Sequence, residues 1–195
     1  MLFLTPPALV QPPAPSPKLA DQLAEALEAA PEALTDRRPA RVPGAKAHAL
    51  ALWARHREAI AGTLPEADRA AFAKAMEALA PTAGDEAGLA ALDAMALLEH
   101  RLPEGRPRWL AAADREGMRT WILLGQSRTD LPDLDAAFQP LMAEDGGAHP
   151  QAVARTRAEL ARYHAALGKQ ERREARKAVS ALLDLVDVFE KPGTR

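Results

Sequence analysis

The stretch that decides the fold runs from residue 149 to residue 190, HPQAVARTRAELARYHAALGKQERREARKAVSALLDLVDVFE. In its first half, Val153, Leu160, His164 and Leu167 recur at steps of seven, four and three residues, the period of one face of an α-helix. A Pro-Gly pair follows at 192–193 and ends the pattern. The sequence therefore predicts two consecutive helices, over about 149–167 and 170–190.

The rest of the chain reads as further helices that Pro and Gly separate. Composition agrees, because Ala, Leu, Glu, Arg and Lys favour helix, whereas the residues typical of strands are scarce. Short connections make successive helices antiparallel neighbours. We expect an all-α fold, a compact antiparallel helical bundle of seven or eight helices in one soluble domain over residues 17–192. The other helices are expected over about 17–30, 45–62, 63–79, 85–100, 107–125 and 130–142.

Two segments of the chain resemble each other. Residues 64–72 read LPEADRAAF and residues 131–138 read LPDLDAAF, and a tryptophan precedes each by ten or eleven residues. One interpretation is an internal duplication, with two related three-helix units over 45–100 and 107–167. The other is that Leu-Pro followed by an acidic residue is a common helix start in an Ala-rich protein.

Residues 1–16 are apolar and Pro-rich, and their prolines exclude a helix interior. The segment lacks the basic start and the long apolar stretch of a complete signal peptide, but its order of residues resembles the tail of one. Two interpretations stay open: a remnant of an export signal on a periplasmic or otherwise exported protein, and a disordered arm on a cytoplasmic one. No segment has the roughly 20 apolar residues that span a bilayer.

The charges nearly balance, with 25 Lys and Arg against 27 Asp and Glu, which argues against a nucleic-acid partner. The absence of Cys excludes a disulfide framework, a thiolate metal site, a Cys nucleophile and covalent haem. Basic residues gather in residues 172–177, but Glu174 lies among them at helix spacing. This pattern predicts a solvated helix face rather than a phosphate-binding strip.

Four polar side chains fall on apolar helix faces: His56, His100, Asp114 and His164. Imidazole and carboxylate are ligands of zinc, copper and non-haem iron, so these four residues are the candidate metal site. An inward Asp114 would need a basic partner, and His56 or His164 is the expected one. The competing interpretation, which the residues favour, is that each is a core side chain with a hydrogen-bond partner.

A noncovalent haem would need a His and often a Met on facing helices, which Met95, Met118, Met142 and His164 could supply. Methionine at helical spacing is, however, usually core filler. The sequence lacks the common enzyme motifs: a Gly-rich phosphate loop, a dinucleotide-binding fingerprint, His-Glu-x-x-His and Gly-x-Ser-x-Gly. The sequence favours a non-enzymatic, exported binding or interaction module with an unknown protein or small-molecule partner. A transition-metal or haem-binding bundle is the first alternative, and an all-α enzyme the second.

Overall fold

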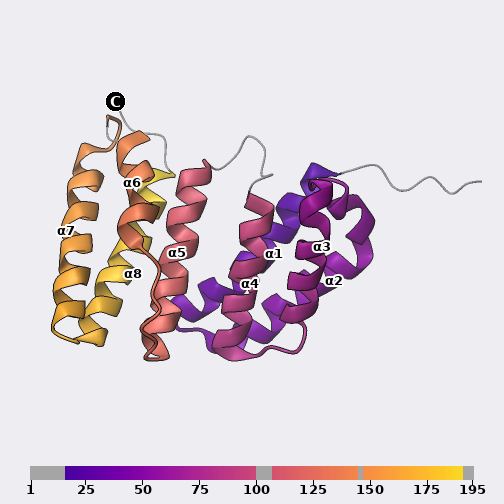
Figure 1. Ribbon diagram of the computed structural model, residues 1–195, viewed down its shortest axis with the longest axis horizontal. Helices are drawn as coiled ribbons and strands as arrows, with labels where there is room; N and C mark the ends of the chain where they lie inside the picture. Colours follow the sequence, from indigo (N-terminus) through magenta and orange to yellow (C-terminus); the bar gives the residue numbers. More distant parts are fainter. Residues whose placement is uncertain (1–15, 100–106, 145–146, 191–195) are drawn as a thin grey trace, which may run out of the picture.

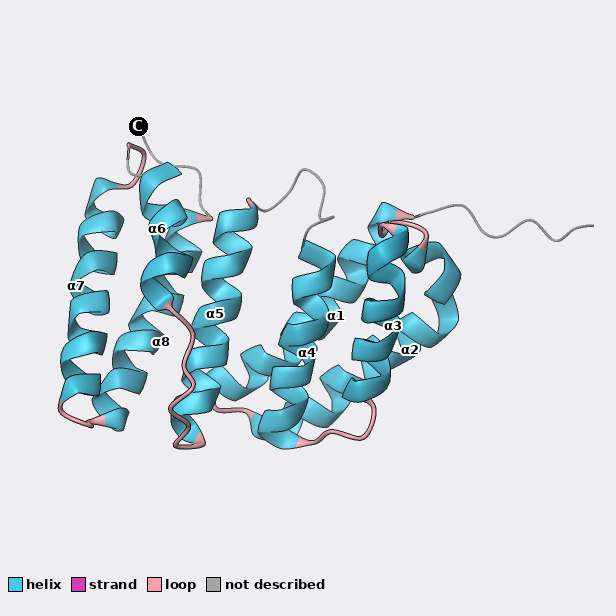
Figure 2. Cartoon of the chain, viewed as in Figure 1, coloured by secondary structure: helices cyan, strands magenta, loops and turns pink. Residues whose placement is uncertain are grey.

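The computed structural model describes residues 16–99, 107–144 and 147–190, and in this part of the chain every regular element is a helix (Figure 2). The expected all-α helical bundle is confirmed. The elements in chain order are α1 (Pro17–Thr35), the 3₁₀ turn η1 (Pro39–Arg41), α2 (Val42–Ala61), α3 (Glu66–Leu79), α4 (Gly84–Glu99), α5 (Arg108–Gly125), α6 (Leu134–Glu144), α7 (Pro150–Gly168) and α8 (Arg172–Phe189).

Two helices organise the packing. Helix α1 packs against α2 and α4, and helix α8 packs against α5 and α7. Contacts of α5 with α4 and with α1 join these two groups, which lie side by side in Figure 1. Because α1 and α8 each lie on α5, the two helices flank it, and this arrangement positions the candidate site.

Helix α1 is longer than its sequence predicts. Pro31 should end the helix near residue 30, yet α1 continues through it to Thr35. The extra turn buries Ala33 and Leu34, and Pro31 itself is buried. Burial of this apolar face therefore outweighs the backbone hydrogen bond that proline removes.

Two other helix starts differ from the expected ones. Thr63 and Glu66 have the spacing of a capping box. Thr63 does not cap α3, however, since its hydroxyl donates to the carbonyl of Ile60 at 2.6 Å and so closes α2 instead. Helix α6 begins at Leu134, several residues later than expected. There the carboxylate of Asp133 accepts the backbone N–H of Ala136 at 3.1 Å and acts as the cap.

The core contains the aromatic residues that the proposed duplication pairs. Trp53 meets Phe72 edge to face with ring centroids 5.0 Å apart, and Trp121 and Phe138 are buried as well. Helix α3 packs chiefly on α4, however, whereas α6, its counterpart in the second unit, packs chiefly on α5. This difference gives the duplication no support, and it stays a prediction.

The Pro-rich segment lies almost wholly outside the described residues, so its interpretation as an arm or an export remnant also stays a prediction. Ser16 is described, and its backbone N–H donates to the carbonyl of Ala59 at 3.3 Å. Among the described residues, no helix combines the length and the apolar character needed to cross a bilayer.

The single tyrosine of the chain gives a direct test of the packing of α7. Tyr163 is 2% exposed, and its burial, together with the charges of Asp135 and Asp133, raises its pKa to about 12. Because the fold favours the neutral phenol, this stabilising contribution is complete below pH 10 and is lost as the pH rises through about 12. Absorbance of tyrosinate near 295 nm should therefore rise about two pH units later in the folded protein than in denaturant. A folded-state midpoint near pH 10 would contradict the burial.

Candidate functional site

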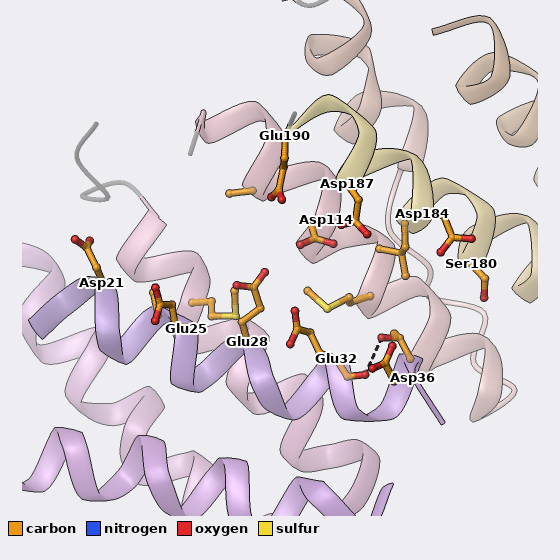
Figure 3. A pocket seen from close by; sticks show the side chains of 16 residues that line it. Asp21, Glu25, Glu28, Glu32, Asp36, Asp114, Ser180, Asp184, Asp187 and Glu190 are labelled. Carbon is orange, nitrogen blue, oxygen red and sulfur yellow. Dashed lines mark hydrogen bonds between the residues drawn. The ribbon is translucent and has the colours of Figure 1, made fainter. Parts of the chain in front are cut away.

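A groove of about 650 Å³ lies between α1 and α8, over α5 (Figure 3). Side chains from the facing sides of α1 and α8 form its walls, and α5 contributes the base. Nine of the 16 lining residues are Asp or Glu, and no Lys, Arg or His is among the lining residues that the structure describes. The acidic residues are Asp21, Glu25, Glu28, Glu32, Asp36, Asp114, Asp184, Asp187 and Glu190.

The α1 wall is acidic because its carboxylates share one helix face. Asp21, Glu25, Glu28 and Glu32 follow one another at steps of four, three and four residues, which stacks them along one side of a helix. The face that carries Leu23, by contrast, is buried in the core. The amphipathic pattern that packs α1 thus also turns its carboxylates toward the groove.

The α8 wall follows the same rule. Ser180, Asp184 and Asp187 lie three or four residues apart and face α1 across the groove (Figure 3). Leu182 and Val186, on the other side of α8, are buried against its neighbours. The two acidic faces therefore oppose each other.

The base of the groove is apolar. Met118 and Ala111 of α5, Met95 of α4 and Leu183 of α8 reach it, and Asp114 of α5 points into it between the two walls (Figure 3). Met95 and Met118 are otherwise buried. The site therefore combines carboxylates on its sides with thioether and aliphatic surface beneath.

The spacing of the carboxylates and one buried oxygen each carry an electrostatic cost. Carboxylates three or four residues apart on one helix repel each other. Asp187 also lies in the last turn of α8, where the helix dipole disfavours negative charge, and that turn holds no basic residue. Oδ1 of Asp21 is buried without a hydrogen-bond partner among the described residues.

The three predicted metal ligands that the structure describes do not form a metal-binding group. His56 is half-buried on α2, His164 lies on α7, and His100 lies outside the described residues. In the part of the chain that the structure describes, no three His, Cys, Asp or Glu side chains are placed to hold a metal ion. The four-residue metal site stays a prediction without structural support.

His164 differs from its expected position. It is 51% exposed, and its Nε2 lies 2.5 Å from a carboxylate oxygen of Asp135 on α6. The expected pair between Asp114 and His164 is therefore wrong. The neighbouring Tyr163 takes the core position instead, since the buried face of α7 follows Thr156, Leu160 and Tyr163.

Asp114 shares its helix face with buried residues, as predicted, but it is only half-buried. Leu110 and Met118, one turn before and one turn after it, are in the core. Asp114 lies at the level where α1 and α8 stand apart, and so it opens into the groove (Figure 3).

Helix periodicity alone does not predict the acidic walls, although the sequence carries a signal for them. Acidic residues at helical spacing in 21–32 and in 184–187 are visible by inspection. Each stripe alone is typical of a solvated helix face. Only the fold shows that the two stripes oppose each other across a groove.

Comparisons of this chain with models of known protein families, with curated proteins and with solved structures found no match.

Proposed function

We propose that the protein is a non-enzymatic binding module whose acidic groove holds a linear polycation, a Lys- or Arg-rich segment of a partner protein. The observation that carries the proposal is the groove itself: two opposed acidic walls over an apolar base, with no basic residue among its described lining. Electrostatic complementarity of this kind selects positively charged ligands and accelerates their association.

The spread of the carboxylates favours a distributed charge over a point charge. A calcium ion takes six to eight oxygen ligands at about 2.3–2.6 Å, so its ligands must converge. Among the described residues no such convergence occurs; the carboxylates instead follow the length of the groove. A ligand whose positive charges are spaced along a chain matches this pattern.

The dimensions fit a short peptide. The α1 wall from Asp21 to Asp36 covers 15 helical steps, about 22 Å at 1.5 Å per residue. An extended peptide of about seven residues covers the same length at roughly 3.3 Å per residue. The methylene stems of Lys or Arg would pack on Met95, Met118 and Leu183 while their charged ends reach the walls.

Three carboxylates provide the test without disturbing the core. Glu25, Asp184 and Asp187 are exposed, and none has an ion pair with a residue that the structure describes. The variant Glu25→Gln/Asp184→Asn/Asp187→Asn should bind hexalysine about tenfold more weakly, taking roughly 0.5 kcal/mol for each exposed charge contact. Isothermal titration calorimetry at fixed ionic strength measures the dissociation constants.

The matched control is Glu58→Gln/Glu77→Gln/Glu144→Gln, which changes the net charge equally at exposed positions outside the groove. Its affinity for hexalysine should stay within twofold of the wild type. An equal loss of hexalysine affinity in the two variants would show that only net charge matters, and it would contradict binding in the groove. Binding of calcium chloride in place of hexalysine would contradict the distributed-cation proposal.

A further inference from the structure

A second, basic pocket adjoins the acidic groove at Ser180. It encloses about 350 Å³ between the end of α1, α5 and the first half of α8. Ser180 is the one lining residue that it shares with the groove. Its described lining consists of Arg37, Trp121, Arg173, Arg176, Lys177 and Ser180, with no carboxylate among them.

Arg176 is held in place by its surroundings on α5. Its guanidinium carbon lies 3.3 Å from the centroid of the Trp121 indole, which is a close cation–π stack. Gly125, one turn further along α5, leaves the space that the guanidinium needs, because a Cβ there would lie 2.9 Å from Nη2 of Arg176. A planar guanidinium fixed in this way presents its N–H edges in a set direction.

The polar groups around this stack are only partly satisfied. The indole N–H of Trp121 donates to Oγ of Ser180 at 3.0 Å, which leaves the hydroxyl hydrogen of Ser180 available to a ligand. Nε of Arg176 is buried and has no hydrogen-bond partner among the described residues. A buried donor of this kind carries a desolvation cost that a bound acceptor would remove.

The positive charge of the pocket is also poorly compensated. Burial lowers the pKa of Arg176, the charge of Arg37 lowers it further, and Asp85 acts in the opposite direction. Lys177 is paired with Glu174 at 2.7 Å, as the sequence indicates. Arg37, Arg173 and Arg176 have no such ion pair with any described residue.

We propose that this pocket binds an oxyanion, the phosphate or carboxylate group of a ligand. Arg176 would donate to it in the bidentate manner that guanidinium groups use with oxyanions. The hydroxyl of Ser180 would add a further donor, and Arg37 and Arg173 would neutralise the remaining charge. One cation of the predicted solvated face over residues 172–177, Arg176, thus points inward. The sequence alone does not show which of these cations does so.

Titration with inorganic phosphate at constant ionic strength tests the site. Intrinsic tryptophan fluorescence and the melting temperature report binding, since Trp121 lines the pocket. We expect both to change saturably in the wild type. Arg37→Gln/Arg173→Gln should weaken phosphate binding at least tenfold, and these exposed side chains leave the core unchanged.

The matched control is Arg55→Gln/Arg157→Gln, two exposed arginines that line neither pocket. Its phosphate affinity should stay within twofold of the wild type. A parallel titration with sodium acetate separates the two sources of the anion: saturation with acetate supports a carboxylate ligand, and saturation with phosphate alone supports a phosphate. No saturable response to either anion, or an unchanged affinity in Arg37→Gln/Arg173→Gln, would overturn the proposal.

Discussion

Replacing Phe72 with alanine is expected to lower the free energy of unfolding by about 4 kcal/mol, the middle of the range for losing a fully buried phenyl ring. Phe72 is 0% exposed on α3, and its ring packs edge to face against Trp53 of α2. The variant loses the burial of the ring, leaves a cavity and removes an aromatic contact, so the three costs add.

Urea unfolding followed by far-ultraviolet circular dichroism measures this loss, and for a chain of this length the melting temperature should fall by about 10 °C. Leu50→Ala is the control, because Leu50 is only partly buried on α2. It should cost clearly less. Equal losses in Phe72→Ala and Leu50→Ala would mean that the Trp53–Phe72 contact is not part of the core.

Replacing Gly88 with leucine is expected to destabilise the protein by about 3 kcal/mol, the upper end of the usual cost of overpacking. Gly88 lies on α4 where α1 and α5 approach it. A Cβ at residue 88 would lie 2.6 Å from Cδ1 of Leu34 and 3.1 Å from Cδ1 of Ile122. The remaining carbons of leucine would force α1 and α5 apart, and these helices bound the acidic groove.

Gly44→Leu is the matched control, since Gly44 is exposed in α2 and a Cβ there meets nothing within 4 Å. That variant should be neutral or stabilise the helix by up to about 1 kcal/mol, because glycine is a poor helix former. The same unfolding experiment compares the two. A Gly88→Leu variant as stable as Gly44→Leu would show that α1, α4 and α5 do not meet as described.

The existence of the helices could be predicted from the sequence, because apolar periodicity and helix propensity agree along most of the chain. Their ends could not all be predicted. Pro31 reads as a helix end, but the buried face around Leu34 carries α1 past it. Thr63 reads as a cap for the following helix, but its hydroxyl bonds backward to Ile60. Tertiary packing sets the helix end in the first case, and a competing local hydrogen bond sets it in the second.

The candidate site was less accessible to sequence reasoning. Adjacent residues of a helix point about 100° apart, so an error of one residue in the predicted buried face is enough to place His164 in the core where the structure has Tyr163. Helix periodicity correctly places Asp114 on the face that carries Leu110 and Met118. It does not tell whether a neighbouring helix covers that position. The opposition of the α1 and α8 carboxylates depends on the packing of α1 and α8 on α5, which no local pattern encodes.

Methionine methyl NMR shows directly whether the acidic groove is the binding site. Met95 and Met118 line the groove, whereas Met76 on α3 and Met142 on α6 do not. In protein labelled with ¹³C at the methionine methyl groups, titration with hexalysine should shift the signals of Met95 and Met118 saturably and leave those of Met76 and Met142 in place. Unchanged Met95 and Met118 signals, or equal shifts at all four of these methionines, would contradict a binding site in the groove.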